Sequence, residues 1–396
     1  MEFIVITVIK ALLILFVYIT VVAYIVWVER KVIAHVQVRM GPSRVGPHGL
    51  LQPLADLVKL ITKEGVLPSY ANRFFYILAP FFAVFMSLIS ISVIPFGTQL
   101  KIGPWTTWMQ LTDLNVGILL VLSVSAMGVY GIALGGWSSN NKYALLGGLR
   151  SSAQMISYEL PMSLAIVSPL LMAGTLSLRE IANWQAGYHL GFIPKWVIFA
   201  MPFPQIFSFI IFMISSFAET NRIPFDLPEA ENELVAGFHV EYSSMAFAAF
   251  STAEYANMIT VCSIATLLFL GGWQPLWPVE YGSNLFAPLI FFLAGAVCLY
   301  HGINPARPFD RYTLPVFGVV FFGAAGLFLF PPAVPVLVPF FWFLAKTGFL
   351  LFTFIWVRAT LPRFRYDQLM GFAWKGMFPA ALLNLLITGF LVALTS

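Results

Sequence analysis

The chain carries little charge for its length. Asp, Glu, Lys and Arg make up 10% of the 396 residues, whereas 60% are hydrophobic. Soluble domains contain roughly 25% charged residues, so this composition excludes an ordinary soluble domain and indicates an integral membrane protein. The net charge of +4 therefore relates to membrane topology and lipid contact, and we expect no nucleic-acid partner.

Residue patterns that hold redox cofactors are also missing. Both cysteines, Cys262 and Cys298, lie inside apolar runs, which argues against a disulfide framework, an iron–sulfur cluster or a zinc site. The histidines show no metal spacing and offer no pair for haem; they are His35, His48, His189, His239 and His301. No G-x-G-x-x-G motif or P-loop follows a strand, so we expect no bound NAD, flavin or metal in this chain.

The sequence consists largely of long apolar segments. Ten of them reach the length of about 20 residues that a bilayer-crossing helix needs. They are residues 3–28, 74–96, 114–136, 153–174, 196–218, 242–271, 285–303, 314–338, 340–357 and 377–394. The first is too long for a signal peptide and lacks a small-residue cleavage site, so we expect it to be retained. The pattern predicts an all-α, polytopic membrane helix bundle with one domain over residues 1–396.

Basic residues predict the orientation of the bundle. Sixteen of the 21 Lys and Arg residues fall in the connection between the first two spans and in alternate connections after it. Cytoplasmic loops are enriched in Lys and Arg, so this side is expected to be cytoplasmic. An even number of spans then leaves both termini outside.

The acidic residues gather in one stretch, residues 219–254. It holds seven of the 17 acidic residues of the chain and only one Lys or Arg, Arg222. A carboxylate at membrane depth is costly when charged, so it faces a polar interior, finds a partner or takes up a proton. The stretch is therefore a candidate proton relay. The alternative is an acidic loop exposed to water.

The first cytoplasmic connection, residues 29–64, combines two patterns. Gly-Pro pairs within residues 40–49 demand fixed turns. After them, apolar residues recur at helical spacing and predict an amphipathic helix that lies at the interface; they are Leu50, Leu51, Leu54, Leu57, Val58 and Ile61. The connection is expected to be a docking floor for something outside the membrane, or else a simple surface anchor.

Three blocks of the sequence resemble the H subunit of respiratory complex I, the proton-pumping NADH–quinone oxidoreductase, whose mitochondrial counterpart is ND subunit one. They are ERKVIAHVQVRMGPSRVGPHGLLQPLADLVKLITKE at 29–64, AETNRIPFDLPEAENELVAGFHVEYSSMAFAAFSTAEYANM at 218–258 and WVRATLPRFRYDQLM at 356–370. SAQMISYELPMSLA at 152–165 agrees more weakly. The resemblance implies a core of eight spans.

The resemblance also implies a quinone chamber whose membrane floor and entrance this chain would form. The substrate would be ubiquinone or menaquinone. Matching positions place residues at or near the chamber: Glu29, Arg30, Arg39, Gln52, Asp56, Lys59, Phe225 and Arg358. Cations there would orient the headgroup or stabilise reduced, anionic states. The alternative role for several of them is to hold the interface with the soluble subunits that roof the chamber.

A proton relay is the second implication. Matching acidic positions form a route from the chamber towards the antiporter-like membrane subunits: Glu159, Glu219, Asp226, Glu229, Glu231, Glu233, Glu241 and Glu254. We add Lys346, in the middle of the span 340–357, as a partner for one of these acids. The alternative is a lysine that reaches the membrane surface.

The resemblance implies partners and a location as well. The partners are the other complex I subunits: the soluble quinone-module subunits, including the one with the terminal iron–sulfur cluster, the small membrane subunits and the antiporter-like subunits. Length and the insert described next favour the inner membrane of a bacterium over that of a mitochondrion.

One departure from the family is an insert. The family passes almost directly from GGWQ, here residues 271–274, to the span that holds FWFLAKTGF at 341–349. This sequence adds residues 275–338, which include an expected two-span hairpin at 285–338. The alternative is a peripheral hairpin packed on the outside of the bundle without a role in the reaction.

Three other functions fit parts of the sequence. The equivalent subunit of a membrane-bound hydrogenase would use no quinone. A stand-alone proton-coupled transporter predicts inverted repeats with broken helices, and we find none in the sequence. A purely structural anchor leaves Glu159, inside an apolar span, and the acidic stretch unexplained.

Arg307 tests the predicted topology, because it lies between the two spans of the insert. We expect a cysteine introduced by Arg307→Cys to react with a membrane-impermeant maleimide only from the cytoplasmic side. Labelling of intact cells from the periplasm would overturn the orientation.

Overall fold

The computed structural model describes residues 2–102, 105–189, 191–201, 203–226, 237–305 and 309–395. Within these ranges nine helices are long and apolar enough to cross a membrane. They are α1 (Glu2–Val36), α3 (Arg73–Ser90), α4 (Gly117–Ser138), α5 (Lys142–Ala173), α9 (Ser244–Phe269), α10 (Ser283–Ile303), α11 (Asp310–Leu329), α12 (Val334–Thr360) and the continuous run of α13 (Tyr366–Gly371), a π-helical turn (Phe372–Met377) and α14 (Phe378–Thr395). The predicted all-α, polytopic membrane bundle is confirmed.

The tenth predicted span, 196–218, is shorter than expected. Its helix, α7, covers only Ile206–Glu219, and a 3-10 turn (Val197–Phe199) precedes it. Pro204 lacks an N–H group and disfavours a helical backbone in the residue before it, so the helix begins after it. A helix of 14 residues is about 21 Å long, less than the roughly 30 Å of a bilayer core.

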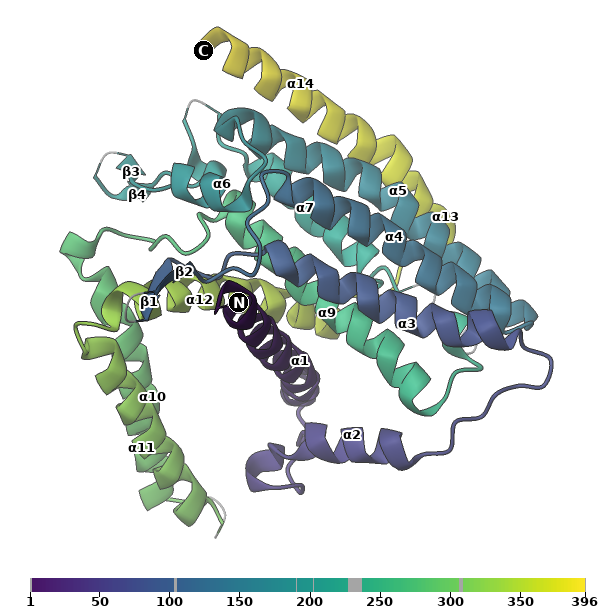
Figure 1. Ribbon diagram of the computed structural model, residues 1–396, viewed down its shortest axis with the longest axis horizontal. Coiled ribbons are helices and arrows are strands. Elements are labelled where there is room, and N and C mark those ends of the chain that lie inside the picture. Colours follow the sequence, from purple (N-terminus) through teal and green to yellow (C-terminus); the bar gives the residue numbers. More distant parts are fainter. Residues whose placement is uncertain are drawn as a thin grey trace.

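The boundaries around the insert also differ from the prediction. Pro331 and Pro332 fall in a turn between two helices, so the predicted span 314–338 is divided. Its first part belongs to α11, and its last residues begin α12, which has Pro335 in its first turn. Helices α10 and α11 form the predicted hairpin, which projects from the rest of the bundle (Figure 1).

Short elements connect the helices. The first connection holds a 3-10 turn (Pro47–Gly49) and the predicted amphipathic helix α2 (Gln52–Thr62). At the opposite end lie the antiparallel pairs β1 (Gln99–Ile102) with β2 (Trp105–Trp108) and β3 (Tyr188–His189) with β4 (Ile193–Pro194), and the short helix α6 (Leu178–Trp184). Three further 3-10 turns lie within the described ranges: Ile91–Val93, Gly237–His239 and Val279–Tyr281.

Helix α9 forms the centre of the bundle. It packs against α1, α3, α6, α7 and α12, and its C-terminal half is buried all round, as expected of a helix that is apolar on every face. Phe209 and Phe212 of α7 pack their rings on Phe269. The hydroxyl group of Tyr18 on α1 donates to the carbonyl oxygen of Ala256 at 2.7 Å.

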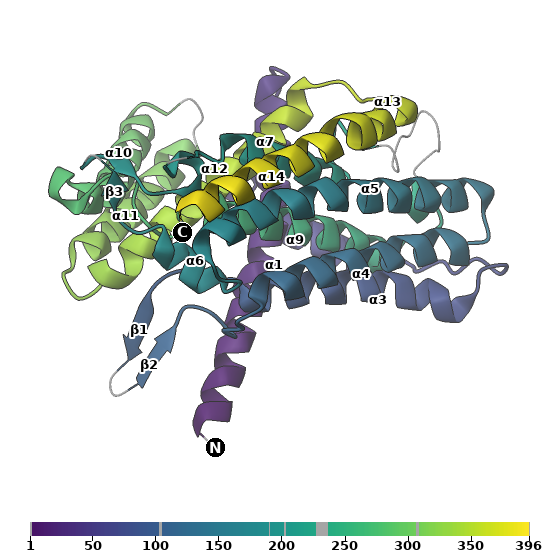
Figure 2. The same cartoon turned by 90° about the horizontal axis from the view of Figure 1, so that it is seen from above.

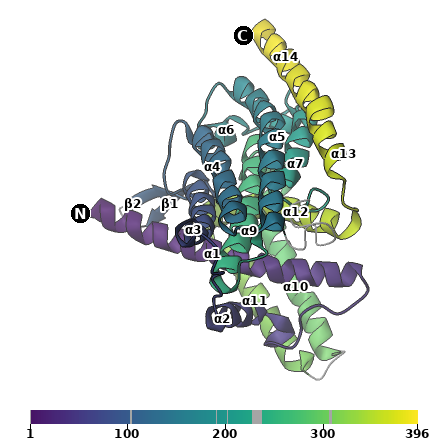
Figure 3. The ribbon, with the colours of Figure 1, turned by 90° about the vertical axis from the view of Figure 1, so that its right-hand side faces the viewer.

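Figure 3 shows how α1 divides the molecule. Helix α2 and the α10–α11 hairpin lie below α1 in that view, and the other long helices lie above it. Seen from above, in Figure 2, α1 crosses the direction of α3, α4 and α5. The N-terminal half of α1 lies beside β1 and β2, where the Lys10 ammonium donates to Thr107 Oγ1 at 2.9 Å. The connections richest in Lys and Arg meet at the other end of α1, and their cytoplasmic location stays a prediction.

Lys346 holds the chain just after α9, at the end of the bundle that carries the strands. Its ammonium donates to three backbone carbonyl oxygens just after α9, those of Leu270 at 2.6 Å, Gly272 at 2.9 Å and Gln274 at 2.6 Å. It also lies 4.0 Å from the centroid of the Trp196 ring. The acidic partner expected for Lys346 is therefore wrong, because carbonyl oxygens and an aromatic face hold the cation instead.

We expect Lys346→Met to lower the free energy of unfolding by at least about 2 kcal/mol, because it leaves three buried carbonyl oxygens without their donor. Thermal unfolding of the detergent-purified protein would measure the change. The control is Lys195→Met, since Lys195 is exposed near the same end and its loss should change stability by less than about 0.5 kcal/mol. Equal melting temperatures for the two variants would contradict this account of Lys346.

Candidate functional site

A buried ion cluster joins four segments where α1 meets the basic connections. Glu29, on α1, is only 4% exposed and accepts a hydrogen bond from Arg358 on α12. The Arg222 guanidinium is 3.9 Å from the same carboxylate oxygen and lies 4.1 Å from the centroid of the Tyr255 ring of α9. The Tyr255 hydroxyl also bonds to Glu29. The structure thus brings together Glu29 and Arg358, both expected near the chamber.

Sequence reasoning missed Arg222 and Tyr255 as members of this cluster. Arg222 stands out in the sequence as the one Lys or Arg in the acidic stretch, and that signal could have marked it as a partner for a buried acid. Tyr255 gives no such signal, because a tyrosine in an apolar span is usually interpreted as a residue that packs in the core.

A second contact holds the loop that follows α7. Arg363 donates to Asp226 at 3.0 Å, and the Phe364 N–H donates to the Pro224 carbonyl at 3.2 Å. Asp226, expected in the proton relay, is therefore an ion-pair partner of the segment after α12. The contact fixes residues 222–226 against the end of that helix.

Phe225 points into the protein. Its ring is 5% exposed and lies between Tyr158, at 5.6 Å, and Phe364, at 5.7 Å between centroids. The amide of Gln154 donates to the Phe225 carbonyl at 2.7 Å. A contact between Phe225 and a quinone stays a prediction, and the ring lies outside the hollow described next.

An open hollow of about 600 Å³ lies beside the ion cluster. It is formed by the end of α1, the turn that follows and the start of α2, and its lining residues are Arg30, Arg39, Met40, Gly41, Pro42, Ser43, Arg44 and Gln52. Three residues expected at the chamber, Arg30, Arg39 and Gln52, thus share one hollow. Arg44 is a further cation in its wall that sequence reasoning did not select.

Asp56 organises one wall of the hollow. It accepts hydrogen bonds from Arg30 at 2.7 Å and from Gln52 at 3.0 Å, and Lys59 lies 3.9 Å away. Arg39 donates to Gln37 at 2.8 Å. Asp56, also expected near the chamber, thus holds two of the lining side chains, whereas the exposed Lys59 contacts Asp56 and does not line the hollow.

Glu219 lies deeper in the bundle, at the end of α7. It is 7% exposed, and Ser125 of α4 donates a hydrogen bond to its Oε1. Its Oε2 has no hydrogen-bond partner among the described residues. Glu219 also lines a cavity of about 20 Å³, together with Ser90, Asn257 and Thr260. Glu159, half-buried on α5, lies close enough to Glu219 for the two charges to interact.

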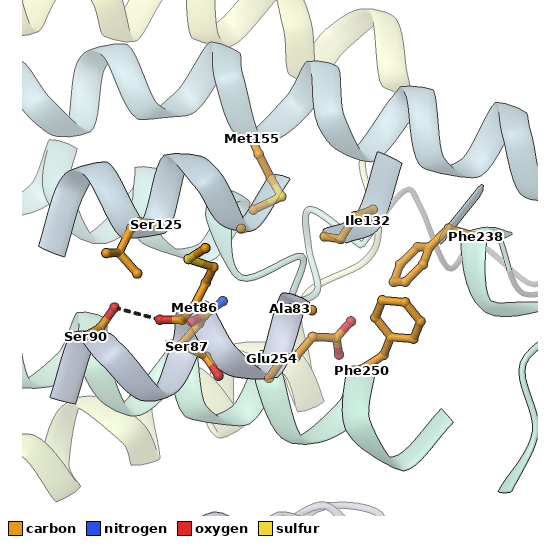
Figure 4. Close-up of a pocket in the computed structure, with 14 residues that line it drawn as sticks. Ala83, Met86, Ser87, Ser90, Ser125, Ile132, Met155, Phe238, Phe250 and Glu254 are labelled. Atoms are coloured by element: carbon orange, nitrogen blue, oxygen red, sulfur yellow. Dashed lines mark hydrogen bonds between the residues drawn. The ribbon is translucent and has the colours of Figure 1, made fainter. Parts of the chain in front are cut away.

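A second cavity continues this polar region towards Glu254. It has a volume of about 30 Å³, and Figure 4 shows Ser87, Ser90, Ser125 and Glu254 around it. Ser90, Ser125 and Asn257 line both cavities. A water molecule needs about 10–15 Å³, so each cavity has room for at least one. Two acids expected in the relay, Glu219 and Glu254, thus each line one of two cavities that share hydroxyl and amide groups.

Glu241 belongs to a separate polar group. Its carboxylate accepts from Asn141 at 2.7 Å, and its backbone carbonyl accepts from the Tyr76 hydroxyl at 2.7 Å. The Tyr76 ring stacks on Tyr242 at 4.1 Å. Burial raises the pKa of Tyr242 to about 12, which further disfavours its ionised form. The rings of Phe238 and Phe250, 5.2 Å apart, pack beside Tyr242 and line the cavity that reaches Glu254.

The remaining relay residues are placed elsewhere. Glu229, Glu231 and Glu233 lie outside the described residues. Lys346 is twelve residues before Arg358 on α12, about 18 Å along the helix axis from the ion cluster. Across the described ranges, no group of three or more His, Cys, Asp or Glu is arranged to hold a metal ion. The candidate ligand site is the arginine-lined hollow, because three of the expected chamber residues line it.

Comparisons with known proteins agree with the resemblance seen in the sequence. The family model described as NADH dehydrogenase matches residues 9–389. An NADH-quinone oxidoreductase H subunit of Solibacter usitatus (strain Ellin6076) is 65% identical over 395 residues, which cover 100% of this chain and 98% of the relative.

Two further relatives extend the match. An NADH-quinone oxidoreductase H subunit of Koribacter versatilis (strain Ellin345) is 49% identical over 99% of this chain and 98% of its own length. Another, from Geobacter metallireducens (strain ATCC 53774 / DSM 7210 / GS-15), is 44% identical over 98% of this chain and 95% of its own length. The chain therefore belongs to the NADH dehydrogenase family, among the H subunits of NADH-quinone oxidoreductase, as its three sequence blocks predict.

Proposed function

We propose that this chain is the membrane subunit of a proton-pumping NADH:quinone oxidoreductase that forms the floor and entrance of the quinone chamber. It would couple quinone reduction to proton translocation, without a redox centre of its own. Its partners would be the soluble quinone-module subunits and the other membrane subunits, in the inner membrane of a bacterium. The names of the relatives favour this function over a hydrogenase-type subunit or a stand-alone transporter.

The observation that carries the proposal is the position of the hollow beside the buried ion cluster. Its volume of about 600 Å³ falls in the range of small-molecule sites, roughly 300–1,000 Å³. Arg30, Arg39 and Arg44 supply N–H donors to it, which suits the carbonyl oxygens of a quinone headgroup. When electrons arrive from a soluble subunit, these oxygens gain negative charge, and nearby guanidinium groups stabilise them.

The ion cluster offers a route for coupling. Arg30, which lines the hollow, follows Glu29 directly in α1, and Glu29 contacts Arg222 and Arg358. Arg222 comes three residues after Glu219. New negative charge in the hollow would compete with Glu29 for these cations, and the balance of charge around Glu219 would change with it. Protons would then pass by way of Ser125, Asn257 and the two small cavities towards Glu254.

Arg39 tests the hollow as the substrate site. We expect Arg39→Ala to raise the KM for a short-chain ubiquinone about 5- to 20-fold with a smaller effect on kcat, because it removes a charged donor from the headgroup. Initial rates in membranes that hold the assembled complex would measure both constants. Arg365→Ala is the control, since Arg365 is exposed and forms its ion pair with Asp367, which is also exposed. An unchanged KM for Arg39→Ala would remove the hollow from the substrate site.

Glu219 tests the proton route. We expect Glu219→Gln to lower proton pumping and coupled quinone reduction at least about tenfold, because glutamine keeps the shape and the Ser125 contact but cannot take up a proton. Subunit content of the purified complex would show that assembly is intact. The matched control is Glu280→Gln, because Glu280 is an exposed acid near the end of the bundle that carries the strands. Pumping at the rate of the unmodified complex would exclude Glu219 from the relay.

A further inference from the structure

The inserted hairpin touches the turn that forms the hollow. His48, in the first connection, has its Nε2 3.3 Å from Thr313 Oγ1 and 3.6 Å from Asp310 Oδ1. Its ring centroid is 6.3 Å from that of Phe317. Asp310, Thr313 and Phe317 are spaced by three and four residues at the start of α11, so one helix face presents all three to His48. The two segments are 265 residues apart in sequence where His48 meets Thr313.

The turn that carries His48 is tightly folded. His48 has a left-handed backbone, with φ 52° and ψ 20°, and Gly49 follows with φ 81°. A Cβ atom at Gly49 would lie 2.2 Å from the carbonyl oxygen of Pro42, so only glycine fits there. Pro42 lines the hollow. His48 is therefore one residue away from a close backbone contact with the wall of the hollow.

The hairpin is itself a stiff element. The backbones of α10 and α11 approach closely at Gly295 and Gly318, where a Cβ atom on either residue would lie 3.2 Å from a backbone carbonyl oxygen of the other helix. Near the strand-bearing end, Phe286 stacks on Trp342 of α12 at 5.4 Å, and Phe291 packs on Phe341 at 6.1 Å. One end of the hairpin is thus fixed to α12, and the other end meets His48.

We propose that the α10–α11 hairpin acts as a strut that holds the turn at residues 41–50 in place, and that His48, Asp310 and Thr313 are positioning residues for quinone binding in the arginine-lined hollow. The inference rests on the proposed function of the hollow, and it gives the insert a role in that site. The hairpin sets the shape of the hollow without touching the reacting atoms. Loss of the contact weakens substrate binding and leaves the chemical step unchanged at saturation.

The contact is tested first without any substrate. His48→Cys and Thr313→Cys are combined, with Cys298→Ala to remove the half-buried thiol of α10, and membranes that hold the assembled complex are treated with a short bismaleimide. A cross-linker is used because an imidazole reaches further than a cysteine side chain does. We expect a cross-linked chain with altered mobility. The pair His48→Cys with Val320→Cys is the control, since Val320 is two turns, about 10 Å, further along α11. Equal yields for both pairs would overturn the strut.

The positioning role is tested by exchanging the side chains at positions 48 and 310. His48→Asp places two carboxylates face to face, and aspartate tolerates the left-handed backbone at this position. We expect this variant to raise the KM for a short-chain ubiquinone about 3- to 10-fold with kcat within about twofold. The exchange His48→Asp with Asp310→His should return the KM to within about twofold of the original, a rescue that general damage to the turn would not show.

Two outcomes decide the proposal. An unchanged KM for His48→Asp, or an exchange variant no better than the single one, would overturn the positioning role. Tyr312→Phe, on the exposed side of the same turn, is the control and should leave both constants unchanged. If cross-linking succeeds but Arg39→Ala does not change the KM, the substrate site fails and the contact itself stands.

Discussion

In an apolar bundle the carboxylate of Glu29 is buried because two guanidinium groups and a phenol reach it from other segments. Removing one partner of a buried ion pair costs about 3–5 kcal/mol, since a charge is left without compensation. The end of α1, the loop after α7, α9 and the end of α12 must therefore meet at one point. This meeting positions Arg30 at the hollow and Glu219 in the interior, so the two halves of the candidate site depend on the same contact.

Hydropathy was sufficient to predict most of the fold. Nine of ten spans exist as long helices, because a run of about 20 apolar residues has few other stable forms in a membrane. Two boundaries could not be predicted from apolarity alone. Pro204 shortens α7, and Pro331 with Pro332 moves the end of α11 and the start of α12. In both places the backbone chemistry of proline outweighs the hydropathy of its neighbours.

Only part of the candidate site could be predicted from the sequence, because some of its groups carry no signal there. Arg30, Arg39 and Gln52 are close in sequence, and a fixed turn was enough to suggest that they share a surface. Ser125 and Asn257 were not selected, because single uncharged polar residues in a span carry no signal until their neighbours are known. The partners of Lys346 are backbone carbonyl oxygens, which every residue has, so no sequence pattern could reveal them. The quinone and relay roles themselves stay proposals.

The small size of the two internal cavities has a consequence for the membrane as an insulator. At about 20 and 30 Å³, each cavity admits at most a few water molecules, far too few to solvate a sodium or potassium ion. A proton needs no such shell, since it passes from one hydrogen-bonded oxygen to the next. If the proposed relay runs through these cavities, a route of this width would conduct protons and block the leak of other cations, so the voltage built by pumping would not be discharged through it.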